Sequence, residues 1–122
     1  METCLVVVED EPGVLEMLKD AFDLNHYRVV SISHPQLLED LPPGLQPGLF
    51  LIDIMLPERT GLEVARQLRQ GPFRAVPMIG MSASRMLVEE ATKSGVFDEV
   101  LRKPFDLQLL LDRVRRHYAR SA

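Results

Sequence analysis

Charged and hydroxyl side chains stand at or just beyond the ends of short apolar runs at four places in this sequence. Glu9 and Asp10 follow the first run, Asp53 follows Leu51-Ile52, and Ser82 and Lys103 follow two later runs. If these runs are parallel strands, their carboxyl ends share one edge of a sheet, which is where open α/β sheets bind ligands. We therefore expect three acids, a hydroxyl and an amine to meet at one site.

This combination of groups favours phosphoryl chemistry on a carboxylate. Carboxylates held close together repel one another, and a divalent cation relieves the conflict. Hard oxygen ligands suit Mg²⁺ better than zinc, which prefers nitrogen and sulfur. An aspartate with an ordinary pKa near ~3.9 is ionised at neutral pH and attacks phosphorus without a general base. Asp53 is the candidate nucleophile, and Lys103 and Ser82 are candidates for contacting the phosphoryl oxygens.

The elements that would position these residues alternate along the chain. Strand-like runs that are apolar throughout alternate with segments whose apolar residues recur every three or four positions, as in helices. Uniformly apolar strands indicate a parallel sheet covered on both faces, so we predict an α/β fold with a (βα)5 repeat and a doubly wound sheet. The expected strands are residues 3–8, 27–32, 49–53, 76–81 and 96–101.

The helical segments differ in strength. The clearest patterns run from Val14 to Phe22 and from Leu107 to Tyr118, and Asp106 is placed to cap the second of these. A short helix at residues 35–41 is expected to lead into a proline-rich loop. We interpret the six methionines as core residues and the three histidines as surface residues.

Length and composition limit the classes of function. The chain has 122 residues, so we expect one domain over residues 1–122. Cys4 is the single cysteine, which excludes an internal disulfide and a multi-cysteine metal site. The apolar runs are too short for a membrane helix and no leader follows Met1, so we expect a cytoplasmic protein without membrane contact. The net charge of −4 argues against direct nucleic-acid binding.

Four strings in this order resemble the receiver domain of two-component response regulators, and the resemblance spans nearly the whole chain. The strings are LVVVEDEP at 5–12, LIDIMLP at 51–57 with Gly61 following, MSA at 81–83 and KPF at 103–105. The resemblance implies a flavodoxin-like sheet of five strands in the order 2-1-3-4-5. It also implies roles for individual residues. The implied Mg²⁺ ligands are Glu9, Asp10, Asp53 and the backbone carbonyl of Met55, and the implied phosphoryl-contacting residues are Ser82 and Lys103.

The resemblance implies a regulatory phosphoacceptor whose only catalysis is its own phosphotransfer and dephosphorylation. A histidine kinase or phosphotransfer protein would donate the phosphoryl group to Asp53, and a protein-interaction surface would then switch. The output domain or effector is not specified, and a homodimer is compatible with the family. Two alternatives remain open: a non-phosphorylatable interaction module of the same fold, and an aspartyl-nucleophile phosphatase. The second is disfavoured because Met55 stands where such enzymes carry a second aspartate.

The sequence departs from the family pattern in one functional respect. Val100 occupies the position, three residues before Lys103, where the family usually has an aromatic ring that rotates during switching. The segment from Gly95 to Lys103 is also one residue longer than is typical, so Phe97 either compensates through a bulge or belongs to the core. Val100 is therefore an uncertain switch position.

Overall fold

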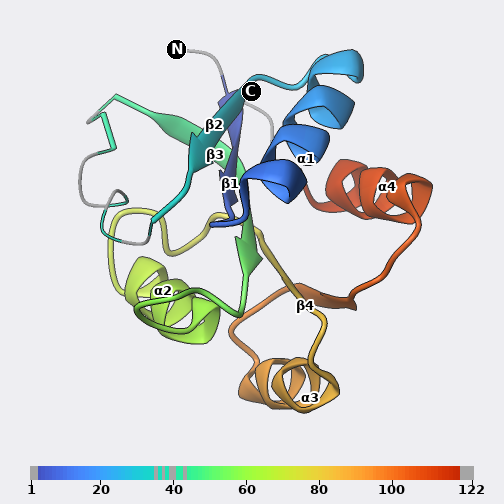
Figure 1. Cartoon of the computed structure of the whole chain (residues 1–122). Helices are drawn as coiled ribbons and strands as arrows, with labels where there is room; N and C mark the ends of the chain where they lie inside the picture. The colour runs from blue at the N-terminus through green and yellow to red at the C-terminus, as the bar shows by residue number, and fades with distance from the viewer. Residues whose placement is uncertain (1–2, 35, 37, 39–40, 43, 119–122) are drawn as a thin grey trace.

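The computed structural model describes residues 3–34, 36, 38, 41–42 and 44–118, which form a sheet flanked by helices (Figure 1). The strands are β1 (Thr3–Val8), β2 (Val29–Ile32), β3 (Gln46–Asp53), β4 (Met78–Ser82) and β5 (Glu99–Arg102). The helices are α1 (Pro12–Leu24), α2 (Gly61–Arg69), α3 (Arg85–Ser94) and α4 (Leu107–His117). The expected helix at 35–41 lies largely outside the described residues.

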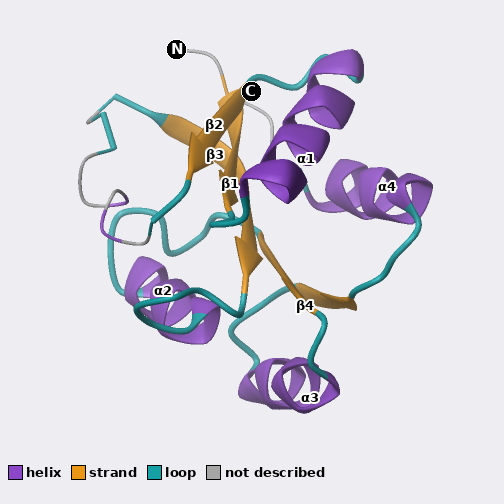
Figure 2. Cartoon of the chain, viewed as in Figure 1, coloured by secondary structure: helices purple, strands orange, loops and turns teal. Residues whose placement is uncertain are grey.

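All five strands are parallel and lie in the order β2-β1-β3-β4-β5, as predicted (Figure 2). The register aligns the carboxyl ends of neighbouring strands. Val8 pairs with Ile52, Asp53 pairs with Met81, and Ser82 pairs with Arg102. The residues that follow these ends therefore share one edge of the sheet.

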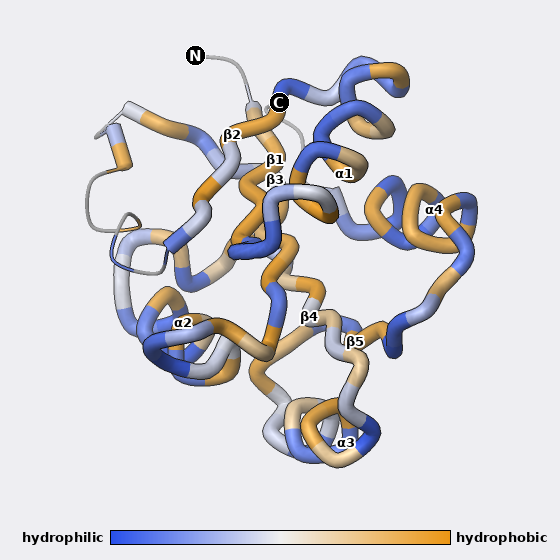
Figure 3. Tube along the Cα trace, viewed as in Figure 1, coloured by the Kyte–Doolittle hydropathy of each residue, from blue (hydrophilic) through white to orange (hydrophobic). Residues whose placement is uncertain are grey.

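Strand alternation divides the core into two layers. One cluster contains Val6, Ile52 and Met78 from the sheet and packs against α2 and α3. The other contains Val7, Leu51 and Ile79 and packs against α1 and α4. Because successive side chains of a strand point to opposite faces, a strand that is buried on both faces has to be apolar throughout. Figure 3 shows this apolar character along the central strands. No described helix has the length and apolarity needed to span a membrane.

The observed strand ends differ from the expected ones by a few residues. β2, β4 and β5 begin later than predicted, because the parallel ladders start only at Val29, Met78 and Glu99. β3 begins earlier and includes Pro47, which pairs with Cys4 where the register shifts. Proline is tolerated at strand starts and irregularities, which explains why Pro47 and Gly48, expected in a loop, belong to β3.

Two other expectations need correction. Met17, Met55 and Met86 are exposed, so only part of the methionine set fills the core. His117 is half-buried rather than fully at the surface, and its Nε2 lies 3.1 Å from Glu99 Oε1. This contact joins the end of α4 to the start of β5.

Arg69, at the end of α2, forms hydrogen bonds to the segments that precede β4 and β5. Its guanidinium donates to the carbonyl oxygens of Val96 (3.0 and 2.9 Å), Arg74 (2.8 Å) and Val76 (2.9 Å). It also contacts Asp98 Oδ2 at 3.0 Å, and that oxygen accepts a hydrogen bond from the Met78 amide at 2.8 Å. A planar guanidinium is suited to several directed hydrogen bonds at once.

We expect Arg69→Ala to lower the free energy of unfolding by about 2 kcal/mol, because several backbone carbonyls lose a charged donor. Partial exposure of the guanidinium limits the loss, since water replaces some of these bonds. Arg66→Ala, at an exposed position of the same helix, is the matched control and should change stability by less than about 0.5 kcal/mol. Urea unfolding measures both, and equal effects of the two substitutions would contradict the assignment.

Candidate functional site

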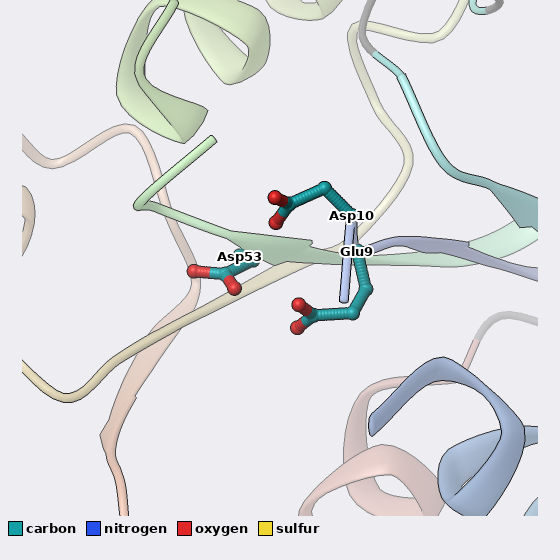
Figure 4. Close-up of side chains that lie close together, drawn as sticks. All are labelled: Glu9, Asp10 and Asp53. Carbon is teal, nitrogen blue, oxygen red and sulfur yellow. The ribbon is translucent and has the colours of Figure 1, made fainter. Parts of the chain in front are cut away.

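Three carboxylates converge beyond the ends of β1 and β3. Glu9 and Asp10 follow β1 directly, and Asp53 is the last residue of β3. One carboxylate oxygen from each lies within 4.8 Å of those of the other two. Figure 4 shows the three side chains turned toward a common space from the two neighbouring strand ends. The structure thus brings together the acidic residues that the sequence singled out.

Burial makes this arrangement electrostatically unfavourable when it holds no cation. Glu9 is 1% exposed and Asp53 is 5% exposed. The pKa of Glu9 is raised to about 7, first by burial and then by its hydrogen bond with Asp53 and the negative charge of Asp53. The Lys103 ammonium and the Glu11 amide act in the opposite direction. The protein's own positive charge therefore neutralises the negative charges of Glu9 and Asp53 only in part.

Lys103 supplies that positive charge from the end of β5. Its Nζ lies 3.3 Å from Glu9 Oε2 and 3.3 Å from Asp53 Oδ2. Burial alone would lower the pKa of Lys103, but the carboxylates of Asp53 and Glu9 outweigh it, so this pKa is raised. The ammonium therefore stays charged and bridges the two buried acids.

Backbone amides fix the orientation of two of the carboxylates. The Met55 amide donates to Asp53 Oδ1 at 2.9 Å, and the Glu11 amide donates to Glu9 Oε1 at 3.2 Å. Such local side-chain to backbone bonds are typical of acidic residues at turns. They hold the carboxylates in one orientation, which leaves their remaining oxygens available to Lys103 and to a ligand.

Gly61, the first residue of α2, closes the loop that follows Asp53. Its amide donates to the carbonyl of Ile54 at 2.8 Å. A Cβ at this position would lie 2.3 Å from the Asp53 carbonyl oxygen and 2.7 Å from the Ile54 Cα. Only glycine permits this approach. The sequence marked Gly61 as part of a motif string, but its positioning role is visible only in the structure.

The acidic cluster lines a pocket of ≈ 600 Å³ that opens at the carboxyl edge of the sheet. Its walls include the apolar side chains of Pro12, Val14, Met55 and Ala83. A second pocket of ≈ 660 Å³ lies between α2 and the side chains of Leu38, Leu41 and Pro42, and none of the described residues that line it is acidic. The charged residues that the sequence singled out thus line the first pocket.

Ser82 is placed beside this pocket but does not reach into the cluster. It ends β4 and is 1% exposed, and its carbonyl accepts from the Lys103 amide at 2.8 Å. Its Oγ accepts a hydrogen bond from the Ser84 amide at 3.0 Å. Among the described residues, its hydroxyl is hydrogen-bonded neither to Asp53 nor to Lys103. The backbone of Ser82 thus lies at the site, while its hydroxyl accepts a hydrogen bond from the residue that precedes α3.

Phe97, three residues before Val100, contributes an aromatic ring to the same face of the sheet. Val100 pairs with Gly80 and packs on the α2 and α3 face of the sheet. Phe97 is 9% exposed, and a Cβ on Gly80 would lie 3.1 Å from its Cε1. Phe97 precedes β5 and is part of the buried cluster, and the β4–β5 register contains no shift, so Phe97 packs in the core and forms no bulge in this ladder. In the sequence, Gly80 inside an apolar run indicates a place where another group packs closely against the strand.

The donor set fits a hard divalent cation. Glu9, Asp10 and Asp53 offer oxygen atoms only, and these oxygens are close enough together to bind one ion. Mg²⁺ is bound in proteins by one or two carboxylates together with water and phosphate oxygens, and a zinc site would need nitrogen or sulfur ligands. The residues present are therefore compatible with Mg²⁺.

Comparisons with known proteins agree with this geometry. The family model of the response regulator receiver domain matches residues 5–115. Response regulator MprA of Mycobacterium tuberculosis is 33% identical over 116 residues, covering 94% of this chain and 50% of MprA. Regulatory protein AtoC of Escherichia coli is 32% identical over 108 residues, covering 87% of this chain and 23% of AtoC. The chain thus spans half or less of the length of these two relatives.

Solved structures show the same fold. The receiver domain of the Francisella response regulator 1452 superposes with a TM-score of 0.82 at 26% identity, covering 97% of each chain. The response regulator TrrA of Thermotoga maritima, in complex with Mg²⁺ and beryllium fluoride, gives a TM-score of 0.82 at 25% identity. That match covers 95% of this chain and 98% of TrrA.

Proposed function

Because this chain belongs to the response regulator receiver domain family, a regulatory family of two-component signal transduction, we propose that Asp53 is its phosphoacceptor. The donor is a phosphohistidine on a histidine kinase or a phosphotransfer protein. The output is a changed protein-interaction surface, read by a further domain or a separate effector. The observation that supports this most directly is the buried Asp53 carboxylate between two further acids and the Lys103 ammonium.

The proposed transfer needs no general base. A carboxylate oxygen of Asp53 forms a bond to phosphorus while the bond between phosphorus and the donor imidazole nitrogen breaks, and the electron pair stays on that nitrogen. The Met55 amide holds Asp53 Oδ1, which fixes the direction in which the carboxylate faces. The carboxyl edge of the sheet leaves the pocket open to an incoming donor.

The proposed metal ligands are Glu9, Asp10, Asp53 and the backbone carbonyl of Met55. A bound Mg²⁺ would neutralise charge on the phosphoryl oxygens and orient the phosphoryl group for attack by Asp53. The chain's own contribution is the convergence of three carboxylates within 4.8 Å, two of them shielded from water. Burial first, and Asp53 second, raise the pKa of Glu9, and a bound cation would favour its ionised form.

Lys103 and Ser82 are proposed to contact the phosphoryl group. The Lys103 ammonium lies at Asp53 Oδ2 and is placed to neutralise an equatorial phosphoryl oxygen. The Ser82 hydroxyl stands at the neighbouring strand end and would donate to another. The full set of acids, lysine and serine supports a phosphorylatable domain over an interaction module that lacks phosphotransfer.

We also propose that residues 1–122 form one receiver domain and that it works in the cytoplasm, where a kinase's phosphohistidine is accessible. MprA, AtoC and the C4-dicarboxylate transport regulator DctD are longer regulators that this chain matches over part of their length. By analogy, the phosphorylated domain acts on an output module or a partner protein. The acidic net charge of −4 does not favour direct nucleic-acid binding by this domain.

The metal proposal is tested by titrating Mg²⁺ while observing the amide signals of Glu11 and Met55, which donate to Glu9 and Asp53. We expect both signals to move, and we expect Asp10→Asn to weaken the affinity at least about tenfold because a charged ligand is lost. Asp20→Asn, at an exposed position of α1, should leave the affinity unchanged. Unmoved amide signals, or equal affinities in the two variants, would reject the assignment.

A further inference from the structure

The second pocket, of ≈ 660 Å³, has a lining of apolar side chains that come from three separate segments. Val64 and Leu68 come from α2, Leu38 and Leu41 from the segment between β2 and β3, and Phe73 from the segment between α2 and β4. All five are buried in the core cluster on this face of the sheet or pack against it. The apolar lining of the pocket is therefore continuous with the hydrophobic core.

One cation, Arg59, lies among the described residues that line this apolar pocket. Arg59 is half-buried and belongs to the loop between β3 and α2. Its Nη1 donates to Oε1 of Gln67, which also lines the pocket. Within the described part of the chain, no carboxylate pairs with this guanidinium. A guanidinium has five N–H donors, so the contact with Gln67 leaves donors for a further acceptor.

These features indicate the chemistry of a complementary ligand. A carboxylate accepts two parallel hydrogen bonds from a guanidinium, and it supplies the negative charge that Arg59 lacks in its neighbourhood. An apolar chain attached to that carboxylate covers the leucine and phenylalanine side chains and removes them from water. The pocket volume lies within the range of about 300–1,000 Å³ that is typical of small-molecule sites.

The backbone around the pocket disfavours a peptide in extended conformation. A peptide that binds as an added strand needs unpaired backbone groups at a sheet edge, and no described strand contributes a residue to this lining. The amides of Gln70 and Gly71 already donate to the carbonyls of Gln67 and Leu68. Recognition therefore depends on side chains, which suits a compact ligand with one acidic group and one apolar group.

We propose that this pocket binds a small monocarboxylate with an unbranched apolar chain, of the chemical class of the medium-chain fatty acids. The carboxylate pairs with Arg59, and the chain lies against Leu68 and Phe73. The site is separate from the phosphoacceptor site, because the described linings of the two pockets share no residue. The inference goes beyond the proposed function and does not depend on it.

The first test titrates octanoate, below its micelle concentration, into the protein and records the methyl signals of its side chains. We expect the signals of Val64 and Leu68 to shift with saturation, while Val14, in the wall of the acidic pocket, does not respond. Octan-1-ol has the same chain without the charge and should bind at least about tenfold more weakly. From hexanoate to octanoate, each added CH₂ should tighten binding about threefold to fourfold.

The second test changes the charge beside the ligand. Arg59→Gln removes the positive charge, and Gln67→Glu places a carboxylate next to the guanidinium, where it competes with the ligand. We expect both variants to bind octanoate at least about tenfold more weakly than wild type and octan-1-ol within about twofold of it. Arg66→Gln, at an exposed position of α2 outside the pocket lining, lowers the net charge by the same amount and should bind octanoate like wild type.

Three results would overturn the proposal. Equal affinities for octanoate and octan-1-ol would do so, as would wild-type affinity for octanoate in Gln67→Glu, because the carboxylate would then not be recognised. Shifts confined to the acidic pocket would place the ligand elsewhere. If octanoate leaves Val64 and Leu68 unmoved, the small-molecule site is rejected, and a short peptide of leucine and glutamate that moves them would identify a peptide as the occupant. No Mg²⁺ or phosphoryl donor enters these experiments, so none of these results bears on Asp53.

Discussion

The Asp53→Asn variant gains no phosphoryl group from acetyl phosphate and Mg²⁺, whereas the wild-type protein gains about 80 Da. The amide nitrogen and oxygen of asparagine carry no negative charge and do not form an acyl phosphate. The substitution is nearly isosteric, and it removes one of the charges that raise the pKa of the buried Glu9. The variant is therefore expected to fold, and intact-mass spectrometry after incubation measures the effect.

Asp106→Asn provides a matched control for this experiment. Asp106 is the exposed N-cap of α4 and accepts from the Gln108 amide at 2.8 Å. Asparagine caps helices about as well as aspartate, so this variant should fold and be phosphorylated like wild type. Phosphorylation of Asp53→Asn to the wild-type extent would refute Asp53 as the acceptor. Loss of phosphorylation in both variants would indicate a general effect of replacing aspartate by asparagine and not a specific role of Asp53.

The Lys103→Met variant is expected to be phosphorylated about 100-fold more slowly than wild type at saturating Mg²⁺. Its Nζ lies at Asp53 Oδ2, so its charge is placed to stabilise the negative charge that develops on the transferring phosphoryl oxygens. Methionine keeps an unbranched chain of similar length and removes only the ammonium. The rate of phosphoprotein formation with acetyl phosphate measures the loss.

Lys19→Met is the control for a lost lysine, because Lys19 is exposed on α1 away from the cluster. Its rate should equal that of wild type. Mg²⁺ affinity of Lys103→Met should be measured in parallel, since removing a cation from the site should not weaken cation binding. A rate for Lys103→Met within twofold of wild type would show that its ammonium holds the acids together without taking part in transfer.

The sequence was sufficient to predict the sheet and the convergence of the charged residues. Uniformly apolar runs such as residues 5–8 have to be buried on both faces, and their alternation with helical segments implies parallel strands between helices. Once the strands are parallel, Asp10, Asp53 and Lys103 come to one edge because each follows a strand. This convergence depends on topology and not on side-chain detail, which is why it could be predicted.

Details that depend on side-chain packing could not be predicted in the same way. The sequence left open whether Phe97 forms a bulge or packs in the core, because the answer depends on space created at Gly80 by a strand distant in sequence. The hydrogen bond of Ser82 to Ser84 is local, yet a serine after a strand has several acceptable partners. The multiple contacts of Arg69 likewise join three segments whose proximity exists only in the folded chain.

The hydrogen bonds of Arg69 restrict movement at one end of α3. The carbonyl of Val96, directly beyond the end of α3, accepts two hydrogen bonds from that guanidinium, so this end of the helix is an anchored pivot. A helix of 10 residues is about 15 Å long, and a tilt about one end displaces the opposite end most. A displacement at the start of α3 would therefore move Met86 further than the residues near Gly95, which lie beside the anchored end.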